Sequence, residues 1–307
     1  MTDPGSIAGG APAPLVVVNP HAGRGGGGAR ARDVRDAAAR WFGAPDVRLT
    51  RGPGDAARWA AEAVAEGRDV VAVGGDGTAR EVLCGVGACG RSDTVVGVVP
   101  LGTGNDLARG LGLPTSLDEA MSVARHGRAT AIDLMRLGDA PALACNVVGF
   151  GINGAVVRSV AASGGSYLGA TVRSWVSHRP AQVQARWEGP DGDGEWNGEL
   201  LAGFLANGPY CGGGMWVGKD GAHGDGWVEL TLVPPASPLR LPGLVRALYD
   251  GGLAAQPGVV RARVRLFEVF ARRVDRVPVD VDGDVGAPLP LTVAVSPQAV
   301  RVRVPDR

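Results

Sequence analysis

The sequence predicts an α/β protein in which an N-terminal, doubly wound and mostly parallel sheet domain precedes a C-terminal, β-rich and largely antiparallel domain. Short runs of β-branched residues alternate with helical segments over residues 15–110. After about Ile132 the pattern changes to strands separated by turns. Glycine-rich loops follow three of the early strands. Strands that alternate with helices favour a parallel sheet with helices on both faces.

The first half begins with Leu15–Val18, a short apolar run that ends at Asn19-Pro20 and predicts a buried strand. The next elements follow in order: a helix over 29–42, a strand over 46–50, a helix over 55–66, a strand over 69–73, a helix over 78–86, a strand over 94–99 and a helix that starts at 105. Asp55 is placed to cap the second helix and Gly67 to end it.

The second half is predicted to be rich in strands, at 143–148, 181–187, 200–207, 227–233 and 259–270. Helix candidates are few, at 154–162, 167–176 and 241–250. Turn signals such as Asp282-Gly283 separate several strands. We therefore expect a flexible tail over 1–13, a first domain over 14–133 and a second domain over 134–307.

The amino-acid composition excludes some classes of function. The 307 residues carry a formal net charge of zero, which removes any broad electrostatic case for nucleic-acid binding. Four cysteines lack CxxC or zinc-finger spacing, as expected for reduced thiols in a cytoplasmic protein. Met1–Pro14 lacks the basic and apolar regions of a signal peptide, and no apolar run approaches the ~20 residues of a membrane span. Any membrane contact is expected to be peripheral.

Three loops at predicted strand ends suit close approach of the backbone to a ligand: Asn19-Pro20-His21-Ala22-Gly23-Arg24-Gly25, Gly74-Gly75-Asp76-Gly77-Thr78 and Pro100-Leu101-Gly102-Thr103-Gly104-Asn105-Asp106. In an open parallel sheet the carboxyl ends of the strands form the ligand crevice. A helix that starts after such a loop directs its N–H groups at an anion. Each loop alone could be an ordinary tight turn, but the three together predict a phosphate-binding crevice.

Asp76 and Asp106 are embedded in two of these loops. A carboxylate beside a triphosphate is repulsive unless Mg²⁺ bridges them or the carboxylate handles a proton. Helix capping is the alternative role for either residue. The chain has no GxxxxGK[ST] motif, and no GxGxxG opens its first strand–helix unit, which disfavours P-loop proteins and dinucleotide oxidoreductases. The pattern favours phosphoryl transfer.

At this point the motifs match a family. Gly74–Thr78, followed by Glu81-Val82, resembles the GGDGTxxEV signature of the diacylglycerol-kinase catalytic domain. Asn19-Pro20-x-x-Gly23 resembles its NPxSG loop, and residues 100–109 resemble its PLGTxNDFAR motif. Short signatures of the second half also agree: Asn146-x-x-Gly149-Phe150-Gly151, Asn207, Gly212–Gly214, Asp225-Gly226 and Asp282-Gly283. The resemblance spans roughly residues 14–305. GGDGT alone is shared with NAD kinases and 6-phosphofructokinases, but the three N-terminal motifs in order are highly specific.

The resemblance implies an NAD-kinase-like fold with the active site between a nucleotide-binding first domain and a lipid-binding second domain, whose last strands can return to the first. ATP would be the co-substrate, and Asp76 and Asp106 match carboxylates linked to Mg-ATP and catalysis. The residues implied to bind the nucleotide are Asn19, Gly23, Thr50, Gly74, Gly75, Asp76, Gly77, Thr78, Ala79, Arg80, Glu81, Gly102, Thr103 and Asn105. A structural Mg²⁺ site of bacterial members would fall on Asp225 and the carbonyls of Ala222 and Trp227.

One position departs from the family pattern. Where the family carries Asp-Gly-Glu, with a glutamate that resembles a general base, this chain has Asp282-Gly283-Asp284. The shorter Asp284 side chain can accept the same proton, although a general base depends on its position. Asp280 or Asp282 could take its place, Asp284 could be a hairpin-turn residue, or activity could be weak.

We therefore expect an ATP-dependent lipid kinase that phosphorylates diacylglycerol or a related lipid. The alternative acceptors are a sphingoid base, ceramide, another long-chain alcohol or NAD. The alternative of another class is a catalytically weak nucleotide-binding or regulatory protein. The lipid would be reached at a membrane surface, with residues 238–248 as a candidate contact. The sequence does not decide between a monomer and a homodimer.

Overall fold

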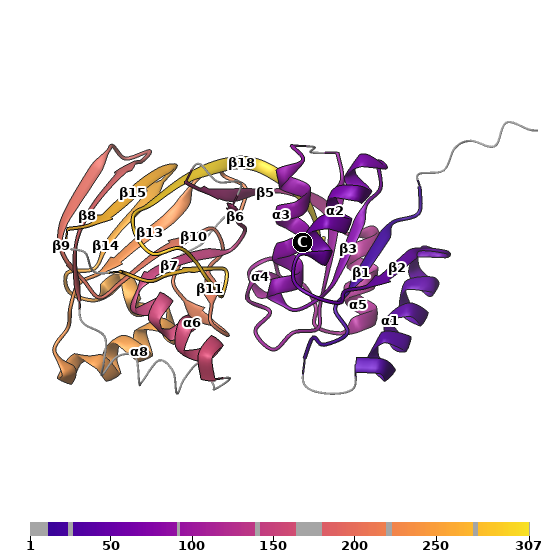
Figure 1. Cartoon of the computed structure of the whole chain (residues 1–307), viewed down its shortest axis with the longest axis horizontal. Coiled ribbons are helices and arrows are strands. Elements are labelled where there is room, and N and C mark those ends of the chain that lie inside the picture. The colour runs from indigo at the N-terminus through magenta and orange to yellow at the C-terminus, as the bar shows by residue number, and fades with distance from the viewer. Residues whose placement is uncertain are drawn as a thin grey trace, which may run out of the picture.

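The structure, a computed structural model, describes residues 12–23, 27–90, 93–138, 142–163, 180–218, 223–272 and 276–306. Two lobes lie side by side, and one long strand, β18, runs from one into the other (Figure 1). The predicted combination of a parallel sheet in the first half and an antiparallel, β-rich second half is confirmed. Most of the predicted tail and the predicted helix over 167–176 lie outside the described residues.

The first lobe alternates strands and helices. Its strands are β1 (Leu15–Val18), β2 (Asp46–Leu49), β3 (Val70–Gly74) and β4 (Val95–Pro100), which pair in parallel in the order β2-β1-β3-β4. Its helices are α1 (Gly27–Phe42), α2 (Asp55–Ala65), α3 (Asp76–Ala88), α4 (Asp106–Gly110) and α5 (Leu117–His126). The parallel order places the carboxyl ends of β1, β3 and β4 at one edge of the sheet.

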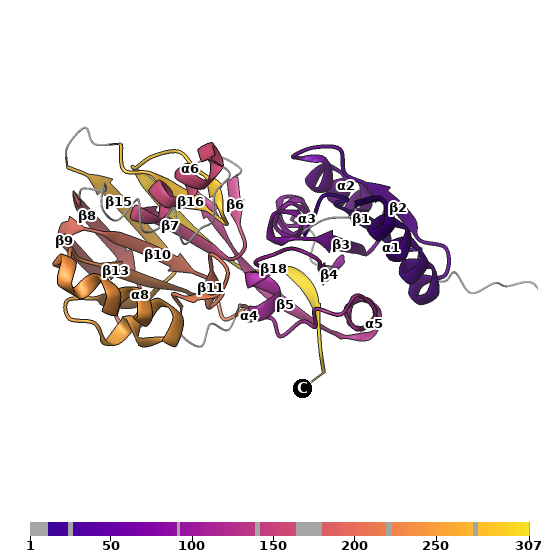
Figure 2. The ribbon, with the colours of Figure 1, turned by 90° about the horizontal axis from the view of Figure 1, so that it is seen from below.

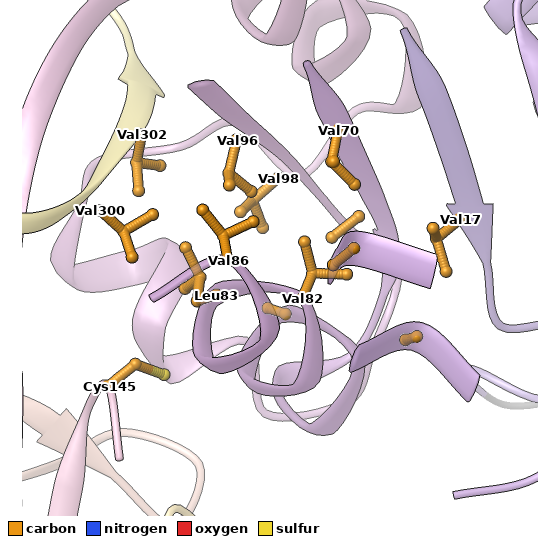
Figure 3. Packing of buried hydrophobic residues seen from close by; sticks show 14 of the residues in the cluster. Val17, Val70, Val82, Leu83, Val86, Val96, Val98, Cys145, Val300 and Val302 are labelled. Atoms are coloured by element: carbon orange, nitrogen blue, oxygen red, sulfur yellow. The ribbon is translucent and has the colours of Figure 1, made fainter. Parts of the chain in front are cut away.

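The core of this lobe explains why α3 forms where it does. Val82, Leu83 and Val86 lie on one helical face, are fully buried, and pack on valines of the sheet (Figure 3). Those sheet valines are Val17, Val70, Val96, Val98, Val300 and Val302. α3 also packs closely on α2, because a Cβ on Gly85 would lie 2.5 Å from the Ala57 carbonyl oxygen. This packing fixes the start of α3 against the end of β3.

The second lobe is built from antiparallel strands. Its first strands are β5 (Arg128–Leu137), β6 (Ala142–Ala144), β7 (Val147–Gly151), β8 (Ala181–Glu188), β9 (Gly194–Leu200), β10 (Ala202–Ala206), β11 (Tyr210–Cys211) and β12 (Met215–Trp216). Its later strands are β13 (Val228–Val233), β14 (Val260–Val264), β15 (Leu266–Ala271), β16 (Val279–Val281), β17 (Asp284–Val285) and β18 (Leu291–Val304). β14-β13-β10-β7-β16-β17 form one sheet, which faces the continuation of the first-lobe sheet through β18-β15-β8-β9.

Helices cover one face of the second sheet. They are α6 (Ile152–Ser163) and α8 (Leu241–Asp250), with the short 3₁₀ turns η1 (Pro238–Arg240) and η2 (Gly252–Ala255) on either side of α8. Figure 1 shows α6 and α8 beneath this sheet, on the side of the lobe away from β15 and β18. Within the described residues, no helix is long and apolar enough to cross a bilayer.

β18 joins the two lobes (Figures 1 and 2). Its first part pairs with β15, and residues Arg301 and Val302 pair in parallel with β4. β5 runs antiparallel to β18 along both parts, with an irregularity between Ser296 and Val300. The described sheet is therefore continuous from one lobe to the other.

Two predicted strands are in fact pairs of strands. The segment predicted as one strand over 259–270 breaks at Arg265 into β14 and β15, which belong to different sheets. The segment predicted over 143–148 breaks at Cys145-Asn146 into β6 and β7, which also belong to different sheets. Apolar periodicity does not distinguish one strand from two that turn between layers.

Candidate active site

The structure brings the three glycine-rich turns together at the carboxyl ends of β1, β3 and β4. The Asn19 amide donates from Nδ2 to Oγ1 of Thr78 at 3.3 Å, which joins the first turn to the second. The Leu101 N–H donates to the Gly74 carbonyl at 2.7 Å, which joins the third turn to the second. Helices α3 and α4 start from the second and third turns, so their positive ends lie at this edge.

Glycine is required where the second and third turns touch. A Cβ on Gly102 would lie 2.5 Å from the Cα of Gly75 and 2.8 Å from Oδ1 of Asn105. Asn105 adopts φ +51° and clamps the third turn, accepting from the Gly102 N–H and donating to the Gly102 carbonyl, each at 3.0 Å. The turns are thus locked to one another by backbone contact, which leaves their N–H groups fixed in direction.

Asp76 and Asp106 lie close together beside Gly104. A Cβ on Gly104 would lie 2.8 Å from Oδ2 of Asp76 and 3.7 Å from Oδ2 of Asp106. Burial, and then the negative charge of Asp106, raise the pKa of Asp76. Asp106 is held by Arg109 at 2.6 Å and by the Gly213 N–H of the second lobe at 2.7 Å. A divalent cation suits this pair of neighbouring carboxylates, because its positive charge would stabilise the charged form of Asp76.

The β16–β17 hairpin brings a second group of carboxylates to the cleft. Asp282 and Gly283 form its two-residue turn, both with positive φ, as an Asp-Gly hairpin turn requires. The Asp282 carboxylate accepts the backbone N–H groups of Cys145, Asn146 and Val147 at 2.8–2.9 Å. These three N–H groups belong to the residues where the chain passes from β6 into β7. Asp282 therefore holds the hairpin against β7, the strand that precedes α6.

Asp284 contacts the first lobe across the cleft. Its carboxylate forms an ion pair with Arg80 of α3, and its side chain is 64% exposed. Arg80 is the third residue after Gly77 of the glycine-rich second turn, so the ion pair ties the hairpin to the predicted nucleotide site. Burial lowers the pKa of Arg80, but the charges of Asp284 and Asp282 outweigh it and raise the pKa overall.

A cavity of about 450 Å³ joins the two groups of carboxylates to an apolar chamber. At its polar end it is lined by Asp76, Gly77, Thr103, Gly104 and Asp106 of the first lobe and by Asp280, Asp282, Gly283 and Asp284 of the hairpin. Its other end is lined by apolar side chains of α6, α8 and the second sheet: Ile152, Val156, Val157, Leu201, Phe204, Met215, Val233, Leu244, Leu248 and Leu253. The cavity can therefore hold a molecule with one highly polar end and one apolar end.

Several predicted nucleotide residues lie near the turns but outside this cavity. Glu81 caps α2, because its carboxylate accepts the N–H groups of Gly54 and Ala56 at 3.0 and 3.2 Å. Ala79 is buried in the core, so only its backbone can face a ligand. Thr50 follows β2 and donates its N–H to the Val18 carbonyl at 2.9 Å. Gly23 closes the first turn with φ +77°. Nucleotide binding by these residues stays a prediction.

The predicted magnesium site at Asp225 lies apart from the cavity. One Asp225 oxygen is in an ion pair with Arg263 and the other accepts the Trp227 N–H at 3.0 Å, while Ala222 lies outside the described residues. The described residues hold no group of three or more His, Cys, Asp or Glu side chains arranged to bind a metal. The Asp225 carboxylate is thus neutralised by an arginine, as Asp106 is, and magnesium binding at Asp225 stays a prediction.

Sequence reasoning missed residues that shape the cavity. Arg109 neutralises Asp106, donates to the Gly104 carbonyl at 3.2 Å and stacks over Tyr210 of the second lobe at 5.5 Å. Asn153 of α6 lies beside Asp280, since both are within 3.4 Å of where a Gly149 Cβ would be. Arg109 sat inside a recognised motif, and its spacing of three from Asp106 on a helix was a usable signal. Nothing local pointed to Asn153.

Comparisons with known proteins agree with this geometry. A model of the diacylglycerol kinase catalytic domain matches residues 13–137, and a model of the YegS C-terminal NAD kinase beta sandwich-like domain matches residues 146–304. A Pseudomonas aeruginosa protein named "Probable lipid kinase YegS-like" is 35% identical over 266 residues, which cover 84% of each chain.

The chain belongs to the YegS-like lipid kinase family. A family member with the same name from Pseudomonas syringae is 31% identical over 281 residues, 89% of each chain. A Bacillus anthracis structure described as a diacylglycerol kinase superposes with a TM-score of 0.75 over 94% of this chain and 96% of that one. At 20% sequence identity this likeness concerns the fold alone. A kinase of this family uses a nucleotide co-substrate, and the two lobes of this YegS-like chain supply the polar cleft between them.

Proposed function

We propose that the protein transfers the γ-phosphoryl group of ATP to the hydroxyl of a lipid, with diacylglycerol as the first acceptor to test. One observation carries the proposal: a single cavity runs from the glycine-rich turns and their carboxylates to a chamber walled by apolar side chains of α6 and α8. A nucleotide phosphate suits the first end, and an acyl chain suits the second. The hydroxyl to be phosphorylated would then lie at their junction, beside the β16–β17 hairpin.

The turns would bind the phosphates through the N–H groups at the starts of α3 and α4 and the hydroxyl of Thr103. Asp76 and Asp106 would hold Mg²⁺, which supplies charge neutralisation at the transferring phosphoryl group. Arg80, with a fixed positive charge in the cleft, would turn from Asp284 toward the phosphates as the nucleotide binds. These roles amount to positioning and electrostatic stabilisation, which dominate phosphoryl transfer.

The lipid must reach the apolar chamber from a bilayer. Leu239 of η1 is 93% exposed, and Tyr249 at the other end of α8 is 52% exposed. Arg240 and Arg246 lie on the same segment. An exposed apolar side chain beside arginines suits the surface of an anionic membrane. We include in the proposal a cytoplasmic protein that touches the membrane during turnover.

The decisive experiment measures lipid phosphorylation with labelled ATP, in mixed micelles that contain diacylglycerol, ceramide, a sphingoid base or a long-chain alcohol. Wild-type protein is compared with Asp76→Asn, which keeps the shape of the side chain and removes its charge. We expect a phospholipid product from the wild type and a rate at least about 100-fold lower from the variant. Equal rates would exclude the role given to Asp76, and no product from any acceptor would overturn the proposal.

A second candidate function is a nucleotide-binding regulator with little turnover. The observation in its favour is that Asp284, which stands where the family has glutamate, is engaged by Arg80. ATP binding in calorimetry without product from the lipid panel would select this function. Turnover gained by Asp284→Glu would show that the shorter side chain is the cause.

A further inference from the structure

Five aspartates line the cavity, and four of them are engaged or lie at its nucleotide end. Asp106 is paired with Arg109 and accepts the Gly213 N–H. Asp282 accepts three backbone N–H groups. Asp284 is paired with Arg80 at the exposed rim. Asp76 accepts the Leu107 N–H at 3.2 Å, next to the glycine-rich turns.

Asp280 is the exception among these aspartates. It lies in β16 opposite Gly149 of β7, and its Oδ1 accepts the Gly283 N–H at 2.8 Å. Among the described residues its Oδ2 has no hydrogen-bond donor, and Asp280 has no cationic partner. Oδ2 lies 3.3 Å from where a Gly149 Cβ would be, and the Asn153 side chain occupies the space beside that point, with its Cβ at 3.0 Å and its Nδ2 at 3.4 Å. Since Asp280 lines the cavity, this oxygen leaves a free acceptor site at the cavity wall.

The position of Asp280 matches the place of the acceptor hydroxyl in the proposed complex. It lies in the hairpin that faces the glycine-rich turns, next to Asn153 at the start of α6 and before the apolar wall formed by Val156 and Leu244. An acyl chain in the chamber would bring its headgroup to this point. A hydroxyl there could donate to Oδ2, and a general base needs this hydrogen-bond reach.

We propose that Asp280, rather than Asp284, accepts the proton of the lipid hydroxyl; this inference rests on the proposed function. As the hydroxyl oxygen forms its bond to the γ-phosphorus, the O–H bond breaks and its proton passes to Oδ2 of Asp280. The bond between the γ-phosphorus and the bridging oxygen breaks, and its electron pair leaves with ADP. The proton then passes from Asp280 to solvent, which restores the carboxylate for the next turnover.

The environment of Asp280 tunes it for this step. Burial raises its pKa to about 8, and the charges of Asp282 and Asp284 add to the rise, while the Gly283 N–H and Arg80 oppose it. Cys211 also lines the cavity, and burial raises the pKa of its thiol well above the usual value, so the thiol is neutral. A base whose pKa lies near the working pH balances basicity against the fraction that is ionised. Below pH 8 the ionised fraction limits the rate.

The test compares wild type, Asp280→Asn, Asp280→Glu and Asp284→Asn in the diacylglycerol assay between pH 6 and 9, at saturating ATP. For the wild type, kcat should rise with pH through a midpoint near pH 8 and approach a plateau only above that pH. Asp280→Asn should lower kcat about 100-fold or more and abolish the rise, with ATP affinity unchanged in calorimetry. Asp280→Glu should restore part of the rate together with the rise. Asp284→Asn should keep the rise and move its midpoint to lower pH, because it removes a negative charge and frees Arg80.

The outcomes separate this inference from the proposed function. Thermal unfolding checks that each variant is folded. If Asp280→Asn does not fold, Asp280→Glu still tests the role of Asp280. An unchanged kcat and pH profile in Asp280→Asn would overturn the role of Asp280 while the proposed function stands. A loss of the rise in Asp284→Asn, with the rise kept in Asp280→Asn, would return the role to Asp284. A wild type that phosphorylates no lipid would overturn the proposed function and this inference with it.

Discussion

Replacing Gly77 by alanine should make the protein more stable and a poorer nucleotide binder. Gly77 lies in the first turn of α3, where a Cβ would meet no atom within 4 Å and the backbone does not need positive φ. Alanine in a helix is favoured over glycine by about 0.5–1 kcal/mol, so the ligand-free variant should gain about that much. The added methyl group would occupy open space at a residue that lines the cavity.

The same methyl group should obstruct the phosphates if the glycine-rich turns bind them. Inserting a methyl into a close contact costs about 1–3 kcal/mol, and 1.4 kcal/mol corresponds to a tenfold change in affinity. We therefore expect Mg-ATP to bind Gly77→Ala at least about tenfold more weakly. Thermal unfolding without ligand and titration calorimetry with Mg-ATP measure the two effects separately.

Gly243→Ala is the matched control. Gly243 is exposed in the first turn of α8, and a Cβ there also meets no atom within 4 Å. This variant should show a similar gain in stability and unchanged ATP affinity. If Gly77→Ala binds Mg-ATP as tightly as Gly243→Ala does, the second turn is an ordinary helix start, and the reasoning that places phosphates against it is wrong.

Further predictions concern charge and reactivity. Asp76→Asn should leave thermal stability unchanged or raise it, because burial disfavours the charged form of Asp76, and it should lower turnover. A variant that unfolds would instead indicate a structural role for Asp76. The pKa of Asp280 is raised from 3.8 to about 8 on folding, so the folded state binds the extra proton, and stability should fall as pH rises between these values by at most about 1.4 kcal/mol per pH unit. Urea titrations should show a smaller loss of stability with pH for Asp280→Asn than for the wild type. Cys89 is exposed, whereas burial raises the pKa of Cys84 to about 12, so brief alkylation at pH 8 followed by mass spectrometry should label Cys89 first.

The parts of the fold that were predictable are those fixed by local chemistry. Leu15–Val18 forms β1 with the predicted bounds, because a run of β-branched residues ended by Asn-Pro admits few other structures. The turns around Gly75 and Gly102 were recognisable because glycine is needed where two backbones touch. The order of such turns along the chain was enough to predict a crevice at the ends of parallel strands.

The parts that were not predictable depend on contacts between distant residues. Arg80 and Asp284 are 204 positions apart, and the Asp106 contact with Gly213 spans 107. In neither pair does the sequence around one residue indicate which distant residue it contacts. Because of the first contact, the aspartate that the motif favours as a base is engaged by a cation. The alternative, Asp280, stood out only once the structure placed its free oxygen beside Gly149.

The distance between the two halves of the site is set by β18 rather than by loops. Val300 and Val302 are buried in the core of the first lobe, while Leu291 and Val293 belong to the core of the second. The ladder between β5 and β18 is interrupted near Gln298, whose N–H donates to the fully buried Asp133 at 2.7 Å. The other oxygen of Asp133 accepts the Gly226 N–H at 2.7 Å. One buried carboxylate therefore fixes both the irregular point of the connecting strand and the loop before β13. Since a buried acceptor with strong partners resists rearrangement, the glycine-rich turns and the β16–β17 hairpin should keep their separation when the cavity is empty.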